Sequence, residues 1–161
     1  MSAAPRRRIF LDSGVLIDGC FSQWSAAKAG LILAVQTIQV TIVLADAVDS
    51  EVRAALVRKA AALPPQDAQR LLGAYDTWRL RADLERWPAP TPAAIARYRP
   101  TILPALRHIK DLAPAISAIE AAPEWVLSTN GAHWGTALAG RAGLRVAHPK
   151  VFLNALTAPH P

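Results

Sequence analysis

Short apolar runs alternate along this chain with longer segments of helical periodicity. The clearest run is residues 40–44 (VTIVL), which is largely β-branched and typical of a strand buried on both faces of a sheet. Directly after it, Val48, Val52 and Leu56 recur every four residues within a predicted helix at 46–63. Strands that alternate with helices in this way favour βαβ units, and therefore a parallel sheet with helices on both faces.

The same criteria predict the remaining elements. Strands are expected at 8–11, 40–44, 125–129 and 144–147. Helices are expected at 14–20, 24–36, 46–63, 65–87, 111–122 and 149–156. The proline-rich segment 87–104 is predicted to be a connection with at most one short helix at 93–98. We therefore predict one domain over 1–161, a three-layer α/β/α sandwich around a mostly parallel sheet of four to five strands.

Composition restricts the environment of the protein. The single cysteine, Cys20, excludes an internal disulfide framework and a thiolate zinc cluster, and it suits a reducing compartment. Three arginines at 6–8 precede a short apolar run, but Asp12 and Asp18 interrupt that run before a signal sequence forms. No apolar run approaches the ~18 residues that a membrane span requires. We expect a soluble, cytoplasmic protein that does not bind a membrane.

The charge balance favours a polyanionic partner. The 18 Lys and Arg residues exceed the 12 Asp and Glu residues, which gives a formal charge of +6. A small basic chain of this kind is predisposed to bind a nucleic-acid backbone. Candidate contacts, none of which the spacing singles out, are Arg6 to Arg8, Arg53, Arg58, Lys59, Arg107 and Lys110.

Acidic and amide side chains fall near the ends of the predicted strands. Asp12 follows the first strand, Glu51 lies in the helix after the second, and Asn130 follows the third. Asp111 begins another predicted helix. Ligands of open α/β sheets bind beyond the carboxyl ends of the strands, so these side chains are candidates for one shared site. Oxygen donors of this kind suit Mg²⁺ or Mn²⁺.

Each of these residues also has a simpler interpretation. Asp12 and Asp111 stand where an N-terminal helix cap is expected. Glu51 is compatible with a solvated helix surface, and Asn130 with Gly131 is a common turn pair. Only their shared location at the strand ends favours a site.

Two further polar residues flank the candidate site. Ser13 is expected near it, either as a cap or as a support for the neighbouring carboxylate. His133 either contacts a substrate phosphate or is a hydrogen-bonded structural histidine. Asp46 and Asp49 also lie close to Glu51 in sequence, but solvated charges at the start of a helix explain both.

Four stretches carry these candidates in order: residues 9–17 (IFLDSGVLI), 47–56 (AVDSEVRAAL), 110–118 (KDLAPAISA) and 125–134 (WVLSTNGAHW). Together they resemble the PIN domain, the nuclease fold shared by many bacterial toxin ribonucleases. The ending 148–153 (HPKVFL) resembles the proline-led segment that closes many members of that family. The resemblance covers nearly the whole chain.

The resemblance implies a metal-dependent ribonuclease. In the family's pattern, Asp12, Glu51 and Asp111 would take the positions that bind Mg²⁺ or Mn²⁺, and Asn130 falls where many members carry a further Asp or Asn. The implied reaction is hydrolysis of RNA by a metal-activated water, and a toxin of this type would have a small antitoxin protein as its partner. Two positions depart from the pattern, because Gly14 replaces a common Asn and Asn130 brings no charge.

These departures keep a second hypothesis open, in which the chain is a catalytically impaired PIN-like module that binds RNA or a protein. A third hypothesis, a doubly wound nucleotide-binding or regulatory domain, is disfavoured because the chain has no glycine-rich phosphate loop. The apolar-rich composition is also compatible with a homodimer.

Overall fold

A parallel β-sheet forms the centre of the computed structural model, which describes residues 6–21, 26–36, 40–131 and 134–158. The sheet has five strands in the order β3-β2-β1-β4-β5, and every neighbouring pair is parallel. The strands are β1 (Arg7–Leu11), β2 (Val40–Ala45), β3 (Leu84–Trp87), β4 (Trp125–Leu127) and β5 (Val146–Ala147).

Helices connect successive strands. The N-terminal half contributes α1 (Ser13–Phe21), α2 (Ala26–Val35), α3 (Asp46–Ala60) and α4 (Pro65–Arg81). The C-terminal half contributes α5 (Pro92–Ile102), α6 (Leu112–Ala121), α7 (Thr136–Ala142) and α8 (Pro149–Thr157). Two short 3-10 turns, Leu103–Ala105 and Ile109–Asp111, lie between α5 and α6.

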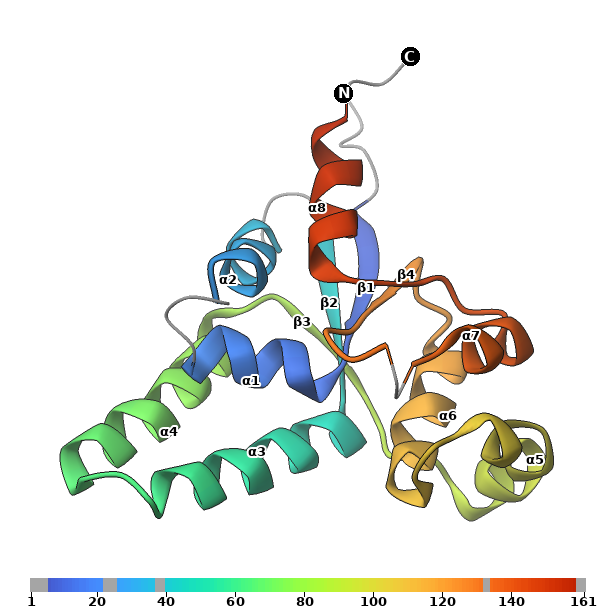
Figure 1. Cartoon of the computed structure of the whole chain (residues 1–161), viewed down its shortest axis with the longest axis horizontal. Helices are drawn as coiled ribbons and strands as arrows, with labels where there is room; N and C mark the ends of the chain where they lie inside the picture. The colour runs from blue at the N-terminus through green and yellow to red at the C-terminus, as the bar shows by residue number, and fades with distance from the viewer. Residues whose placement is uncertain (1–5, 22–25, 37–39, 132–133, 159–161) are drawn as a thin grey trace.

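The strand order determines which face each helix covers. The chain moves from β1 through β2 to the β3 edge, and it then crosses back to β4 and β5. Because parallel crossovers are right-handed, this reversal places the later helices on the opposite face. Figure 1 shows α1 to α4 on one side of the strands and α5 to α7 on the other. The predicted three-layer α/β/α sandwich is confirmed, with a sheet that is entirely parallel.

Burial explains why β1 and β2 lie in the middle of the sheet. Ile9 and Phe10 of β1 and Ile42 and Val43 of β2 have no exposed surface, as expected for strands covered on both faces. The helix α8 completes the core, because its fully buried Phe152 packs edge-on against Trp125 of β4 with ring centroids 5.6 Å apart.

Three sequence predictions need correction. Residues 84–87 form the edge strand β3 rather than the end of a helix at 65–87. The helix α5 spans the whole segment Pro92–Ile102 and not only 93–98, with Thr91 capping its start. The helix α7 was not predicted at all. No helix among the described residues is long and apolar enough to cross a membrane.

Candidate functional site

Asp12 stands at the carboxyl end of the central strand. Its backbone N–H donates to the Leu127 carbonyl at 2.9 Å, which extends the pairing of β1 with β4 by one residue. Asp12 is buried, with 8% of the residue exposed, and its Oδ1 accepts the N–H of Ser13 at 2.8 Å at the start of α1. Asp12 therefore accepts one free N–H group at the start of α1. Its carboxylate also contacts the loop after β4.

That second contact is made by Ser128, which the sequence analysis did not single out. The buried Ser128 hydroxyl donates to Oδ2 of Asp12 at 2.9 Å and accepts the N–H of Asn130 at 3.1 Å. One hydroxyl thus orients the Asp12 carboxylate and holds the turn that carries Asn130. Asn130 itself is exposed at this turn. The signal for Ser128 was its position as the first residue after β4, equivalent to that of Asp12 after β1.

Glu51 lies in the second turn of α3 and is half-buried. Burial is the main cause that raises the pKa of its carboxyl group, and the negative charges of Asp12 and Asp111 raise it further. The positive charge of Lys110 and a hydrogen bond with the Ser13 side chain act in the opposite direction. Residues from two other segments, 12–13 and 110–111, thus act on the Glu51 carboxylate.

Asp111 ends the 3-10 turn Ile109–Asp111 and directly precedes α6. It is 8% exposed, and although it stands at the N-cap position its side chain makes no capping hydrogen bond. The capping interpretation of Asp111 is therefore wrong. Its negative charge instead faces the neighbourhood of Glu51.

The structure thus brings Asp12, Ser13, Glu51 and Asp111 to one edge of the sheet, with Asn130 tied to Asp12 through Ser128. This edge lies beside the point where the chain reverses between β1 and β4, which is where open α/β sheets bind ligands. His133 lies outside the described residues. Among the residues that are described, no three His, Cys, Asp or Glu side chains are grouped closely enough to hold a metal ion as they stand.

Gly14 permits a close approach of the loop after β4. A Cβ atom at this position would lie 2.9 Å from the Thr129 hydroxyl oxygen, which is closer than such atoms pack. A side chain at position 14 would therefore require Thr129 to move. Glycine at position 14 thus lets the loop after β4 lie against the start of α1 without displacing Thr129.

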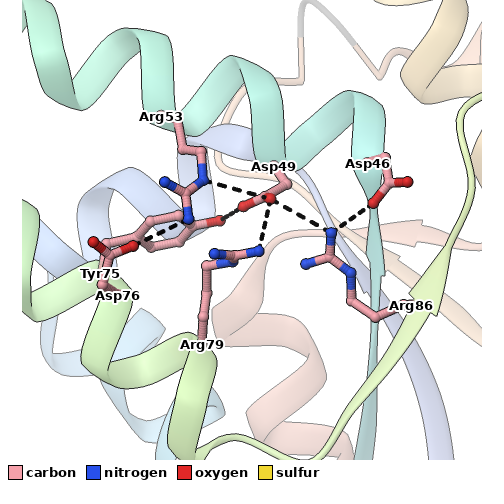
Figure 2. A network of polar contacts seen from close by, with 7 residues as sticks. All are labelled: Asp46, Asp49, Arg53, Tyr75, Asp76, Arg79 and Arg86. Carbon is pink, nitrogen blue, oxygen red and sulfur yellow. Dashed lines mark hydrogen bonds and ion pairs between the residues drawn. The ribbon is translucent and has the colours of Figure 1, made fainter.

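A second polar cluster holds α3, the helix that carries Glu51. Asp49 points into the space between α3, α4 and β3, as Figure 2 shows, and it is 7% exposed. Its Oδ1 accepts the Tyr75 hydroxyl at 2.6 Å. Burial and this hydrogen bond raise the pKa of Tyr75 far above its ordinary value. The prediction that Asp49 is a solvated charge at the helix start is wrong.

Three arginines surround the other Asp49 oxygen. Oδ2 lies 3.1 Å from Nη2 of Arg79, 3.5 Å from Nη2 of Arg86 and 3.6 Å from Nε of Arg53. Two of these arginines have a second acidic partner, because Arg86 contacts Asp46 at 2.6 Å and Arg53 contacts Asp76 at 3.1 Å (Figure 2). This network joins α3 to α4 and to the edge strand β3.

The raised pKa of Glu51 predicts a pH effect on stability in metal-free protein. In the unfolded chain a Glu titrates near pH ~4.3. Between that value and the higher folded pKa, the folded state binds more protons, so stability falls as pH rises through this window. We expect Glu51→Gln to be more stable than wild type at about pH 7, with the difference vanishing near about pH 4. Urea unfolding with EDTA at several pH values measures this. A difference independent of pH would contradict the placement of Glu51.

The fold is an α/β domain built on five parallel strands. The structure is similar to a chain in the crystal structure of VapBC2 from Rickettsia felis bound to a DNA fragment from their promoter, with a TM-score of 0.59. The match covers 88% of this chain and 98% of that chain, at 14% sequence identity. At this identity the likeness concerns the fold. No family model and no curated protein sequence matches the chain.

Proposed function

We propose that the protein is a metal-dependent endoribonuclease that hydrolyses RNA phosphodiester bonds. The observation that supports this most is the meeting of Asp12, Glu51 and Asp111, which come from three separate segments. The pKa of Glu51 is raised by burial and by the charges of Asp12 and Asp111. Carboxylates held this close repel one another in the absence of a cation. Such an arrangement costs stability unless a ligand relieves it.

The donor chemistry of the site fits Mg²⁺ or Mn²⁺. Both ions prefer oxygen ligands, commonly one or two carboxylates together with water and substrate phosphate. Asp12, Glu51 and Asp111 would hold the ion, and small side-chain movements would have to close the group, since the described residues are spaced too widely as they stand. When bound, such an ion supplies a Lewis acid that activates water and stabilises the charge of the phosphodiester.

The remaining residues of the edge orient this site. The two carboxylate oxygens of Asp12 are held by separate hydrogen bonds. The Ser13 N–H donates to Oδ1, and the Ser128 hydroxyl donates to Oδ2. Lys110 places a positive charge beside Glu51, where it would also attract a phosphate. Asn130 supplies a neutral side chain at the rim of the site, and we propose that it contacts substrate rather than adding charge to the metal site.

A toxin role follows as part of the same proposal. The fold is that of a chain in VapBC2, which was crystallised as a complex on promoter DNA. We propose that this protein likewise has a small protein partner, an antitoxin that would cover the acidic edge. A homodimer of this chain is compatible with the same arrangement.

Cleavage of an unstructured RNA tests the proposed reaction. We expect the purified protein to cleave such an RNA with Mn²⁺ or Mg²⁺ and not with EDTA, and Asp111→Asn to remove most of the cleavage because it removes one charge of the site. Products separated on a denaturing gel report the rate. Equal cleavage with and without divalent ions would contradict the mechanism.

The alternative, a PIN-like module that binds RNA or a protein without cleaving, is favoured by Gly14 and by the neutral Asn130. Calorimetric titration with Mn²⁺ separates the two functions. Saturable binding that is lost in Glu51→Gln supports the nuclease, whereas no measurable binding supports the module.

A further inference from the structure

A cleft of about 430 Å³ extends from the acidic edge between α3 and α6. One wall is a single face of α3, whose lining residues recur at helical spacing: Ala47, Glu51, Ala54 and Arg58. The other wall is the start of α6, with Lys110, Ala113 and Pro114. The alanines leave room between the helices, so the cleft is open because its walls carry small side chains.

The cleft carries charges of both signs. Glu51 stands at one end, and Arg58 follows about two helical turns further along α3. Lys110 lies on the other wall, beside Glu51. The cleft thus has one cation, Lys110, beside the carboxylates and a second, Arg58, further along α3.

These two cations remain available to a ligand, unlike several other basic candidates. Within the described residues, Arg58 and Lys110 are exposed and neither forms a salt bridge with an Asp or Glu. By contrast, ion pairs within the chain engage the remaining arginines of the N-terminal and α3 groups: Arg6 with Asp83, Arg7 with Glu124, Arg8 with Glu85, and Arg53 with Asp49 and Asp76.

We propose that this cleft binds an unpaired nucleotide of single-stranded RNA, with Arg58 and Lys110 contacting its backbone phosphates. The inference rests on the proposed function and adds the path of the substrate. The volume falls within the range of roughly 300–1,000 Å³ found for small-ligand sites, so it suits one splayed nucleotide and not a helix. Single strands offer such unstacked nucleotides, whereas a duplex presents a rigid A-form surface.

The test measures binding without cleavage. Fluorescence anisotropy follows a 5′-labelled ten-nucleotide uridine RNA titrated with protein in EDTA, at several salt concentrations. Each lost phosphate contact removes a slope of about 0.7 in the plot of log affinity against log salt, equivalent to about fivefold in affinity at 0.1 M salt. We expect about fivefold weaker binding for Arg58→Ala and for Lys110→Ala, and about 25-fold for the double variant, whose slope falls by about 1.4.

Arg81→Ala is the matched charge control. Arg81 is also exposed, but it is the last residue of α4 and lies just before β3 begins. It is therefore near the amino end of a strand, whereas the site lies at the carboxyl ends of the strands. It should change affinity less than about twofold. Ala54→Leu tests the shape of the cleft separately, because Ala54 is exposed and a leucine there narrows the space while keeping every charge. We expect weaker binding with an unchanged salt slope.

The outcomes separate this inference from the proposed reaction. The cleft proposal would be overturned if the double variant bound RNA with unchanged affinity and salt slope. It would also be overturned if a duplex RNA of the same length bound as tightly and depended on Arg58 to the same extent. Binding that depends on Arg58 and Lys110 in a protein that never cleaves RNA supports the cleft and contradicts the nuclease. Metal-dependent cleavage with unchanged binding in the double variant supports the nuclease and contradicts the cleft.

Discussion

Asp12→Asn is expected to abolish metal-dependent RNA cleavage while leaving the fold intact. An asparagine oxygen can still accept the Ser13 N–H, and its amide can donate to the Ser128 hydroxyl, so both local contacts survive. What is lost is one negative charge at the carboxyl end of β1. Changes to residues that only support metal ligands typically reduce metal affinity or activity by roughly 10–100-fold. We therefore expect the loss of a ligand charge to reduce the cleavage rate by more than about 100-fold.

Asp18→Asn is the matched control for this experiment. It makes the same chemical change on α1, the helix that Asp12 precedes, without altering the acidic edge. Its cleavage rate should stay within about twofold of wild type, because Asp18 is partly exposed and takes no part in the proposed site. Thermal unfolding of both variants reports whether the fold is retained. Cleavage by a folded Asp12→Asn protein at the wild-type rate would refute the assigned role of Asp12.

Asp49→Ala is expected to have the largest effect on stability. The variant removes the carboxylate that Tyr75 and three arginines share. Arg53 keeps Asp76 and Arg86 keeps Asp46, but the described residues show no other acidic partner for Arg79, whose side chain is 24% exposed. Removing one partner of a largely buried ion pair typically costs 3–5 kcal/mol, and we expect a loss of about 3 kcal/mol in the free energy of unfolding.

Urea unfolding measures this loss, and two variants define its cause. Asp76→Ala removes an acidic partner of the same network whose side chain is 55% exposed, so it should cost less than about 1 kcal/mol. Replacing Arg79 by methionine together with Asp49→Ala should recover part of the stability, because the uncompensated charge is gone. A cost below about 1 kcal/mol for Asp49→Ala would show that the network does not hold α3.

The central strands could be predicted from the sequence because they are buried on both faces. Residues 40–44 carry no charged side chain, and their one polar residue, Thr41, is itself β-branched. The run 8–11 is followed by a charged residue, Asp12. The corresponding strands β2 and β1 begin and end within one residue of the prediction. Parallel pairing also follows from the helix-sized connections, so the architecture was predictable from local patterns.

The edge strand β3 was not predictable in this way. Leu84 continues the apolar stripe of the preceding helix, and Glu85 and Arg86 are poor strand formers. The strand pairs with β2 through its backbone, and its charged side chains find partners across the sheet. Glu85 receives two hydrogen bonds from Arg8 of β1, at 2.6 and 2.9 Å, and this pairing lowers the pKa of Glu85. Such long-range partners are invisible in a local window.

The candidate site shows the same division. The positions of Asp12, Glu51 and Asp111 near the expected strand ends predict that their side chains approach one another. The effect of the Asp12 and Asp111 charges on the pKa of Glu51 agrees with this prediction. The burial of Asp49 does not follow from its position, because charges at a helix start are normally solvated. Its spacing contained the signal, since Asp49, Val52 and Leu56 lie on one buried face of α3. The identity of its partners depends on how α4 packs, which the sequence does not specify.

Anomalous diffraction from a crystal of the protein grown with Mn²⁺ tests the account most directly. The account predicts a single strong peak at the carboxyl edge of the sheet, with oxygens of Asp12 and Asp111 within about 2.0–2.6 Å and Glu51 bound directly or through water. A fully occupied peak elsewhere, or none at this edge at millimolar Mn²⁺, would contradict it.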